Sequence, residues 1–263
     1  MVLNIQKVQK YGSEILKTVA EICERNHIRW YMAYGSALGT IRHSGPIPWD
    51  YDIDIYVPEC DMPKFLSAMD RELPSKYWVD YRNGTKHDRS FPRIGLRGYE
   101  TEILHVDVYR LGGLPRNLRK LKVFTRYSRI LFVIWKSKTV DIKFYYPDRK
   151  RRFISRMVKG LTVLIPLKTV LKLIDKQANR IPFDEAEIVA SPLTTMNPKR
   201  MHNRKVFDNS VLKKYEDFYV RVPGDYLKYL KVQFGNWKEY PPEEERSKEM
   251  NKEYIVRRIH EVR

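Results

Sequence analysis

Three aspartates lie at alternate positions in the apolar stretch IPWDYDIDIYV, residues 47–57. Successive side chains of a strand point to opposite faces, so this spacing predicts that Asp50, Asp52 and Asp54 share one face. Aspartate is a poor strand former, and like charges at this separation repel one another. The arrangement is therefore expected to place a cation among the carboxylates.

A further aspartate, Asp107, lies in the alternating stretch TEILHVDVYRL, residues 101–111. Together with Asp52 and Asp54 it would form an all-oxygen pocket suited to a hard divalent cation. Magnesium binds few carboxylates and completes its coordination with water and substrate phosphate, so one or two Mg²⁺ ions are the expected cofactor. These three aspartates are thus the candidate metal ligands and catalytic residues.

A candidate phosphate site precedes the aspartates. Gly35 and Ser36 end the aromatic stretch IRWYMAYGS, which predicts a strand running into a tight turn. The backbone N–H groups and the hydroxyl of such a turn suit a phosphate, because glycine permits close approach. Arg42 and His43 follow on a predicted short helix and could add charge-assisted contacts to phosphate oxygens.

Each of these signals has an ordinary explanation when it is taken alone. A D-x-D pair is common at surfaces and in turns, a single Gly-Ser pair is nearly uninformative, and Asp107 could simply face solvent. The order of the features is more specific: a turn, a short helix, a D-x-D strand and a later strand with one aspartate. That order is typical of the nucleotidyltransferase fold, an α+β fold with a mixed sheet flanked by helices.

The remaining pattern supplies the elements that would hold these residues. Apolar residues at helical spacing predict a helix over about residues 4–26, a short helix over 62–73 and a helix over about 224–234. Residues 77–82, 91–98 and 101–111 read as successive strands, and short strands are expected in the final third before a charged helical tail.

Composition limits the partners and the compartment. The 263 residues carry a formal net charge of +18, which favours anionic partners such as phosphorylated metabolites, nucleic acid or an acidic membrane surface. Cys23 and Cys60 make neither a disulfide framework nor a four-ligand zinc site. The N-terminus lacks the apolar core of a secretory signal, and charges interrupt every apolar run, so we expect an intracellular protein without a transmembrane segment.

Residues 115–160 contain 15 lysines and arginines against Asp141 and Asp148, and apolar runs alternate with the basic residues. Two interpretations stay open. The segment could bind the anionic inner leaflet of a membrane, where each basic residue contributes about 1 kcal/mol. Alternatively, it could be a helical subdomain that packs its apolar stripes on the core while its charges are merely solvated.

The stretch YMAYGSALGTIRHSGPIPWDYDIDIYV resembles the signature of the LicD family, with Gly-Ser, Leu-Gly, Arg-His, Ile-Pro-Trp-Asp and the D-x-D in close register. The segment YEDFYVRVPGDYLKYLKVQFGNWKEYPP is similar to the closing segment of the same family. This resemblance covers about residues 5–112 and 200–245. It implies a polymerase-beta-like nucleotidyltransferase core over 1–114, a basic helical insertion over 115–199, and a C-terminal segment over 200–263 that completes the core.

The resemblance also implies an activity, which fukutin-type transferases share in related form. Phosphocholine, or a related phospho-alcohol, would be transferred from a CDP-activated donor such as CDP-choline to a sugar hydroxyl of a lipid-linked glycan, as in lipopolysaccharide or a teichoic acid precursor. A cytoplasmic enzyme, peripheral on the inner face of the membrane, is expected.

The same resemblance assigns roles to individual residues. Gly35 and Ser36 would hold the donor phosphate, with Arg42 pairing to it. Asp52, Asp54 and Asp107 would bind metal, and Asp107 is the candidate base. Trp49 and Asp50 would support the site without binding the metal. The cysteine-rich insertion of some eukaryotic relatives is absent, so no zinc is expected.

Two other functions are compatible with the sequence. The chain could be a nucleotidyltransferase acting on RNA, an antibiotic or another small acceptor, but the Ile-Pro-Trp-Asp register argues against this. It could also be a non-enzymatic module that binds anionic surfaces, although that gives no reason for an acidic strand in so basic a protein. Nucleic acid is not the expected partner.

Overall fold

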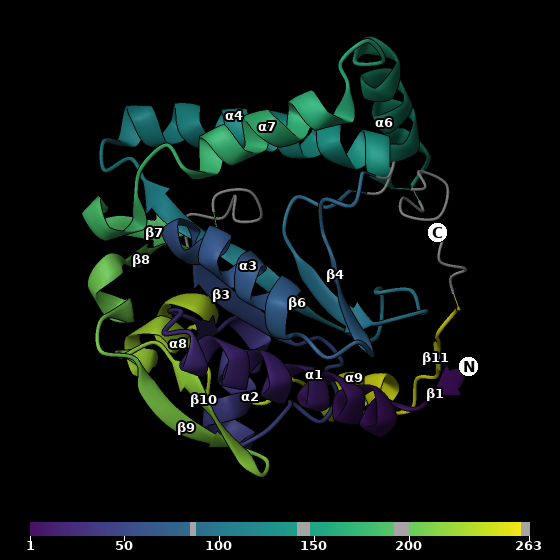
Figure 1. Ribbon diagram of the computed structural model, residues 1–263, viewed down its shortest axis with the longest axis vertical. Helices are drawn as coiled ribbons and strands as arrows, with labels where there is room; N and C mark the ends of the chain where they lie inside the picture. Colours follow the sequence, from purple (N-terminus) through teal and green to yellow (C-terminus); the bar gives the residue numbers. More distant parts are fainter. Residues whose placement is uncertain (85–87, 141–147, 192–199, 259–263) are drawn as a thin grey trace.

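The computed structural model describes residues 1–84, 88–140, 148–191 and 200–258 (Figure 1). Its helices are α1 (Ile5–Arg25), α2 (Tyr34–His43), α3 (Met62–Glu72), α4 (Leu118–Thr139), α6 (Arg149–Leu161), α7 (Leu167–Ala178), α8 (Tyr226–Phe234) and α9 (Glu243–Met250). Short 3-10 helices are η1 (Glu59–Asp61), η2 (Phe183–Glu185) and η4 (Arg204–Phe207). The strands are β1 (Val2–Leu3), β2 (Tyr31–Met32), β3 (Asp54–Pro58), β4 (Tyr77–Asp80), β5 (Arg93–Leu96), β6 (His105–Leu114), β7 (Ile188–Ala190), β8 (His202–Asn203), β9 (Val211–Tyr215), β10 (Phe218–Val222) and β11 (Tyr254–Ile255).

A central mixed sheet organises the protein. Its strand order is β2-β3-β6-β5-β4, and β7 pairs with the C-terminal end of β6 and with β8. β3 and β6 run parallel, whereas the other neighbouring strands are antiparallel. Helices α1 and α3 pack together against this sheet (Figure 1). The protein is thus a mixed α/β structure with a mixed sheet flanked by helices, in agreement with the predicted α+β class.

The first helix follows directly from its sequence. The side chain of Asn4 accepts a hydrogen bond from the backbone N–H of Lys7, which satisfies one of the free donors of the first turn of α1. The apolar residues recur at helical spacing and are buried, among them Ile15, Leu16 and Val19. This face covers the side of the sheet that is opposite to the aspartates.

The structure corrects two predictions about local structure. The predicted aspartate strand begins only at Asp54, and Asp50 and Asp52 lie in the preceding loop. The reason is a turn in which the N–H of Asp50 donates to the carbonyl of Ile47 at 2.9 Å, so these residues form no ladder. The predicted Gly-Ser turn is wrong as well, because Gly35 and Ser36 lie in the first turn of α2.

Most of the other predicted elements are confirmed. The predicted helices correspond to α1, α3 and α8, and the predicted strands of the first half correspond to β4, β5 and β6. In the final third, β9 and β10 form an antiparallel hairpin, and α9 is the predicted helix of the charged tail. The chain then returns to its beginning, since β11 pairs with β1.

The basic segment contains a small core of its own. Leu131 and Trp135 of α4 pack against Val170, Leu171 and Ile174 of α7. The two helices lie side by side along one edge of the molecule, and α6 stands beside them (Figure 1). This packing agrees with the helical-subdomain interpretation for α4 and α7. Two members of the predicted segment, Asp141 and Lys143, lie outside the described residues.

Ion pairs join this helical layer to the sheet. Arg110 of β6 binds both carboxylate oxygens of Glu59, and its Nη1 donates to Asp175 Oδ1 of α7 at 2.6 Å. Arg82 reaches the same oxygen of Asp175 at 2.8 Å. Arg110 and Glu59 are almost fully buried, whereas the side chain of Asp175 is 41% exposed. Among the described helices, every one is too short or too polar to span a bilayer.

Candidate active site

Charged residues from three adjacent strands form a row across the sheet. In the parallel pairing of β3 with β6, Asp54 is opposite Asp107, and in the antiparallel pairing of β5 with β6, Arg93 is also opposite Asp107. Directly paired residues of a sheet project from the same face. The register therefore brings together Asp54 and Asp107, as predicted, and adds Arg93 of β5 on the other side of Asp107, which the sequence did not predict.

Arg93 is a cation that pairs with one of the aspartates, Asp107. Its Nε donates to Asp107 Oδ1 at 2.5 Å and its Nη2 to Asp107 Oδ2 at 3.2 Å. Arg93 Nη1 also pairs with Glu102 Oε2 at 3.1 Å. Burial by itself would raise the pKa of Asp107, but His105 and Arg93 bring that pKa below its ordinary value. Asp107 is thus held as a carboxylate by a bidentate ion pair.

The predicted role of Asp107 as the base does not fit this geometry. A guanidinium occupies both of its oxygens, and His105 Nε2 lies 3.6 Å from Oδ1. The hydroxyl of Tyr109 donates to Oδ2 at 3.5 Å. A carboxylate with all of these neighbours has little capacity left to accept a proton from a substrate.

Asp54 is in the opposite situation. No described residue donates a hydrogen bond to its carboxylate, although its backbone N–H donates to Ser36 Oγ at 2.8 Å. Burial, with the neighbouring carboxylates of Asp107 and Asp52, raises the pKa of Asp54 well above its ordinary value. Burial also raises the pKa of Asp52, where Asp107 adds repulsion. Each of these carboxylates therefore makes the ionised form of its neighbours less favourable.

The carboxylates of the site fit the predicted magnesium in their chemistry. Among the described residues, no group of three or more His, Cys, Asp or Glu side chains is arranged to hold a metal ion. The chemistry of the set nevertheless fits a hard divalent cation, because Asp52 and Asp54 repel each other and Asp54 has no described donor. Asp107 could join them only if it shared its oxygens with Arg93.

The N-terminus of α2 is the second part of the site. The N–H groups of Gly35 and Ser36 belong to the first helical turn and have no acceptor among the described residues. Such N–H groups, at the positive end of the helix dipole, bind anions. The hydroxyl of Ser36 is used differently from the prediction: it bridges the backbone N–H of Asp54 and, at 3.5 Å, the carbonyl of Asp52. Ser36 thus fixes α2 to the aspartate segment.

Asp50 lies beside this helix end. A Cβ at position 35 would be 2.8 Å from Asp50 Oδ2, so only glycine gives this carboxylate room. Asp50 Oδ1 also accepts a hydrogen bond from the N–H of Asp52 at 3.3 Å, as expected of a residue that shapes the loop. Burial raises the pKa of Asp50 to about 6, and Asp52 contributes.

The loop that carries Asp50 is held by α1. Gln9 Nε2 donates to the carbonyl of Ile47 at 2.8 Å and to that of Asp50 at 2.7 Å. Gln9 is buried, and its bond to Ile47 is shielded from water, while the bond to Asp50 is partly buried. The sequence gave no signal for this role, because a glutamine on an amphipathic helix usually faces solvent.

Arg42 and His43 lie at the other end of α2. Arg42 follows Gly35 by seven positions, which corresponds to about 10 Å along a helix axis. Arg42 Nη1 donates to the carbonyls of Trp237 and Glu239, each at 3.2 Å, and its guanidinium lies 4.6 Å from the ring centroid of Tyr240. The structure therefore does not bring these two residues to the phosphate end of the helix.

Trp49 belongs to this second cluster. Its ring lies 5.8 Å from the ring of His43 and 5.9 Å from that of Tyr240, centroid to centroid. Arg42 and Arg246 both lie over the Trp49 ring, at 5.7 and 5.4 Å. This packing joins the C-terminal segment to the end of α2 that lies away from Gly35.

Three partly exposed rings border the charged row. Tyr109 follows Asp107 on the same face of β6, in edge contact with Tyr34 at 5.2 Å between centroids. Phe91 lies against Tyr109 at 4.7 Å. The sequence did not single out these rings, nor Arg93 and His105, because only the strand register shows that they surround Asp107.

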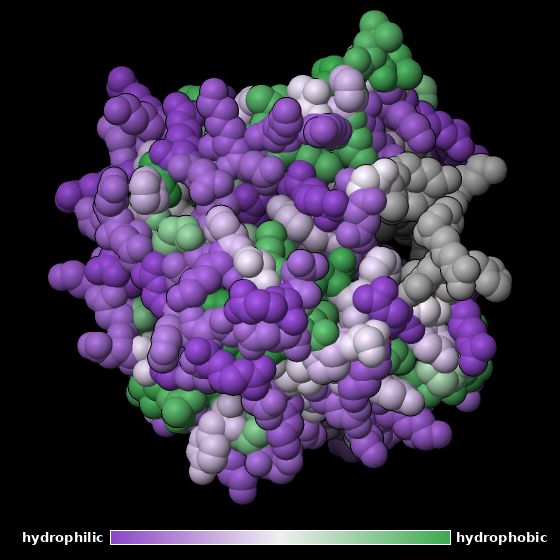
Figure 2. Space-filling view, viewed as in Figure 1, coloured by the Kyte–Doolittle hydropathy of each residue, from purple (hydrophilic) through white to green (hydrophobic). Residues whose placement is uncertain are grey.

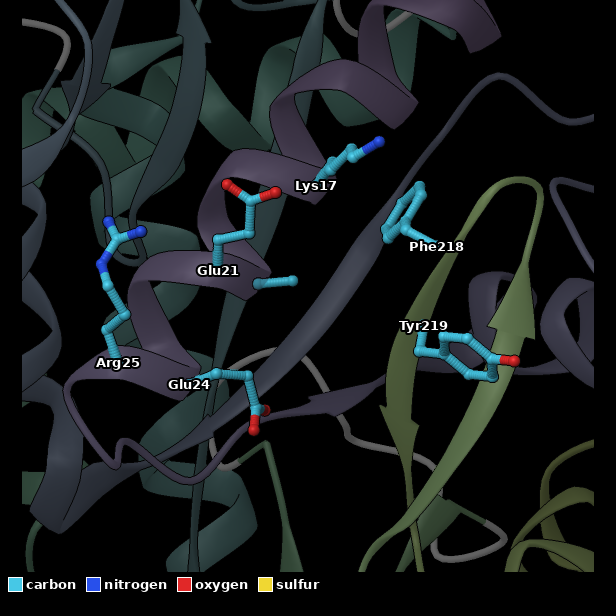
Figure 3. A pocket seen from close by; sticks show the side chains of 7 residues that line it. Lys17, Glu21, Glu24, Arg25, Phe218 and Tyr219 are labelled. Carbon is cyan, nitrogen blue, oxygen red and sulfur yellow. The ribbon is translucent and has the colours of Figure 1, made fainter.

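A hollow elsewhere on the surface is unrelated to these residues. It is a groove of about 360 Å³ between α1 and β10, lined by side chains that include Lys17, Glu21, Phe218 and Tyr219 (Figure 3). None of the predicted site residues contributes to it. The sheet face that carries Asp54 and Asp107 is therefore the candidate active site on chemical grounds.

A mixed sheet that presents paired aspartates beside a helix N-terminus defines the class: an α/β protein with an acidic site on its sheet. The comparisons with known proteins agree. The family model "LicD/FKTN/FKRP, nucleotidyltransferase domain" matches residues 27–160, which is just over half of the chain. This chain belongs to the LicD family.

Two relatives extend the comparison. The chain is 21% identical, over 261 residues, to the "Lipopolysaccharide cholinephosphotransferase LicD" of Haemophilus influenzae, an alignment that covers 92% of this chain and 94% of that protein. It is 30% identical over 134 residues to an uncharacterized protein of Rickettsia typhi, covering 51% of this chain and 41% of that protein. The similarity to the first relative thus extends well beyond the segment that carries the aspartates.

Proposed function

We propose that this protein transfers phosphocholine, or a closely related phospho-alcohol, from a CDP-activated donor to a sugar hydroxyl of a lipopolysaccharide-type glycan. The observation that carries the proposal is the convergence of Asp54 and Asp107 in one register pair, next to free N–H groups at the start of α2. The similarity along nearly the full length of a lipopolysaccharide cholinephosphotransferase supports the choice of reaction.

In this reaction the sugar hydroxyl attacks the phosphorus of the phosphocholine moiety, and the bond to the CMP oxygen breaks. The hydroxyl proton passes to a carboxylate of the site, and CMP leaves with the electron pair. Gly35 and Ser36 would donate their N–H groups to a donor phosphate. Arg93 would keep Asp107 ionised and hold its carboxylate in place. Arg93 is thus a positioning residue and does not contact the substrate.

Asp52, Asp54 and Asp107 are the proposed ligands of one or two Mg²⁺ ions. Bound there, the metal supplies neutralisation of the donor pyrophosphate as negative charge develops on the leaving CMP. The carboxylate of Asp50 lies beside the start of α2. A phosphate bound at that helix end would be repelled by this carboxylate, and a cation would offset the repulsion. The positive charge of Arg93 and the positive end of the α2 dipole would also offset negative charge at the site.

The rings beside Asp107 suit the choline end of the donor. A quaternary ammonium binds aromatic faces through cation–π attraction. Tyr34, Phe91 and Tyr109 are partly exposed and lie beside the charged row, with the Tyr109 hydroxyl 3.5 Å from Asp107 Oδ2. We propose that they favour choline over uncharged alcohols. The glycan acceptor would be lipid-linked, with the enzyme peripheral on the inner face of the membrane.

The test is the release of CMP from CDP-choline, compared with CDP-ribitol and CDP-glycerol, in the presence of membranes that contain lipid-linked glycan. We expect release that requires Mg²⁺ and stops when the metal is chelated, with CDP-choline as the preferred donor. A Phe91→Leu variant should lose this preference more than it loses turnover of CDP-glycerol. Incorporation of label from nucleoside triphosphates, with no CMP release from any CDP-alcohol, would replace the proposal with a nucleotidyltransferase.

A further inference from the structure

Helix α6 faces outward with its apolar side. Phe153, Ile154, Met157 and Leu161 recur at positions that share one face of a helix, and their exposed fractions are 62%, 47%, 50% and 80%. The residue of α6 that is buried is Ser155. Surface helices normally turn the apolar face to the core and the polar face to water. In α6 this orientation is reversed.

The connection from α6 to α7 continues the apolar surface. Val163, Leu164 and Ile165 are exposed by 70%, 92% and 37%. In Figure 2 this end of the molecule forms a hydrophobic projection, at the place where Figure 1 shows the top of α6 and its connection to α7. The projection is anchored, because Lys138 Nζ of α4 donates to the carbonyl of Thr162 at 2.6 Å.

The charge of α6 matches a particular kind of surface. The helix carries six basic residues and no acidic one: Arg149, Lys150, Arg151, Arg152, Arg156 and Lys159. Exposed apolar residues on one face and a strongly basic opposite face are the features of helices that lie in the interface of an anionic bilayer. A protein partner would have to supply both an apolar groove and acidic groups around it.

The neighbouring helix α4 shares this feature only in part. Leu131 and Trp135 of α4 are buried against α7, whereas Val123, Tyr127 and Ile130 of the same helix are 65%, 38% and 55% exposed. In α6, by contrast, no apolar side chain is buried. A helix that makes so few apolar contacts within the described chain is suited to a contact outside it.

We propose that α6 and the connection 162–166 form the membrane-contacting surface of the protein, inserting Phe153, Leu161 and Leu164 among the acyl chains of a bilayer with anionic headgroups. The inference rests on the peripheral attachment included in the proposed function, but it does not depend on the transfer reaction. It places the contact at one end of the molecule, and the carboxylates of the active site lie on the central sheet.

Vesicle flotation tests the proposal with the full chain. The wild-type protein should float with vesicles of phosphatidylglycerol mixed with phosphatidylcholine, less at high salt, and not with pure phosphatidylcholine. The double variant Phe153→Glu with Leu164→Glu should bind the anionic vesicles at least about tenfold more weakly. Its matched control is Tyr219→Glu with Leu212→Glu, which changes one aromatic residue and one leucine that are 62% and 50% exposed on the β9–β10 hairpin.

The outcomes separate this inference from the proposed activity. If the α6 variant still releases CMP from CDP-choline with a soluble saccharide acceptor but no longer floats, the membrane surface is supported independently of the chemistry. Equal binding of the α6 variant and its control would overturn the proposal. So would a dimer in size-exclusion chromatography that the α6 variant converts to a monomer, because a second copy would then cover this face. Absence of CMP release from the wild-type protein, with flotation of wild type and variants as predicted, would contradict the proposed function alone.

Discussion

Charge is used in opposite ways in two regions of this protein. On the sheet, Asp54, Asp107 and Arg93 are in register, and the side chains of Asp107 and Arg93 are only 7% and 13% exposed. On α6, six basic residues lie on a helix with a single buried residue, Ser155. Buried charges must be matched atom by atom, whereas solvated charges act through their sum. The first region can therefore do chemistry at one point, and the second can recognise a surface.

The largest effect is expected from a substitution in the charged row of the sheet. Asp54→Asn keeps the shape of the side chain but removes the charge that a metal-bound donor requires, so CMP release should fall by about a thousandfold. The matched control is Asp217→Asn, a change at an exposed carboxylate that pairs with Lys17 at 2.8 Å. Full activity of the Asp54 variant, with its circular dichroism unchanged, would refute the assignment of the site.

The second prediction concerns the partner of Asp107. Arg93→Met leaves a buried carboxylate without its guanidinium, so the free energy of unfolding should fall by about 3–5 kcal/mol in urea titrations. Adding Asp107→Asn to Arg93→Met should restore part of this loss, because the uncompensated charge is then gone. If the double variant lost the sum of the two single effects, the ion pair would not be what holds the row together.

The third prediction concerns the pH dependence of stability that follows from the buried histidine His202. His202 stacks on Tyr229 at 4.7 Å between centroids, and burial lowers its pKa to about 4. Between pH 6.5 and 4 the unfolded chain binds a proton at this site that the folded protein does not. Stability contributed by neutral His202 is thus complete above pH 6.5 and decreases as the pH falls, by about 3 kcal/mol at most.

His202→Gln should flatten the pH dependence of the unfolding free energy in that window. Urea titrations at a series of pH values between 4 and 7 measure the difference between the two proteins. An identical slope for variant and wild type would show that His202 titrates normally in the folded state.

The smallest effect on stability is expected from substitutions of the basic residues of α6. Replacing Arg151 and Lys159 of α6 by glutamine should change the free energy of unfolding by no more than about 0.5 kcal/mol, because these side chains are solvated. The same variant should bind anionic vesicles more weakly than the wild type. A large loss of stability would mean that the charges of α6 are part of the fold, and the two regions would then not differ as described.

Much of the fold could be predicted from local pattern. The helical spacing of apolar residues located α1, α3 and α8, and strand alternation located β4, β5 and β6. The failures occurred where a distant contact overrides local preference. The alternation of Asp50, Asp52 and Asp54 reads as one strand, but Gln9 of α1 binds the carbonyls of Ile47 and Asp50 and holds a turn instead.

Only part of the candidate site could be predicted, because some of its residues are brought in by contacts between distant segments. Asp54 and Asp107 were identified because their residue type is unusual in an apolar strand. Arg93 was missed because a single arginine in a short strand has no local signal until its neighbour across the sheet is known. Arg42 was assigned to the phosphate because it follows the Gly-Ser pair on a predicted short helix and by resemblance to the LicD family, but α2 carries it to the opposite end of the helix.

The sequence by itself determined the residue types and their local periodicity: a cluster of carboxylates, an amphipathic α1, an excess of positive charge after residue 115 and membership of the LicD family. Only the tertiary structure decided that Asp54, Asp107 and Arg93 meet in one row and that α6 turns its apolar side outward. The physical reason is that strand register and helix orientation are set by packing between segments far apart in the chain, which no local pattern encodes.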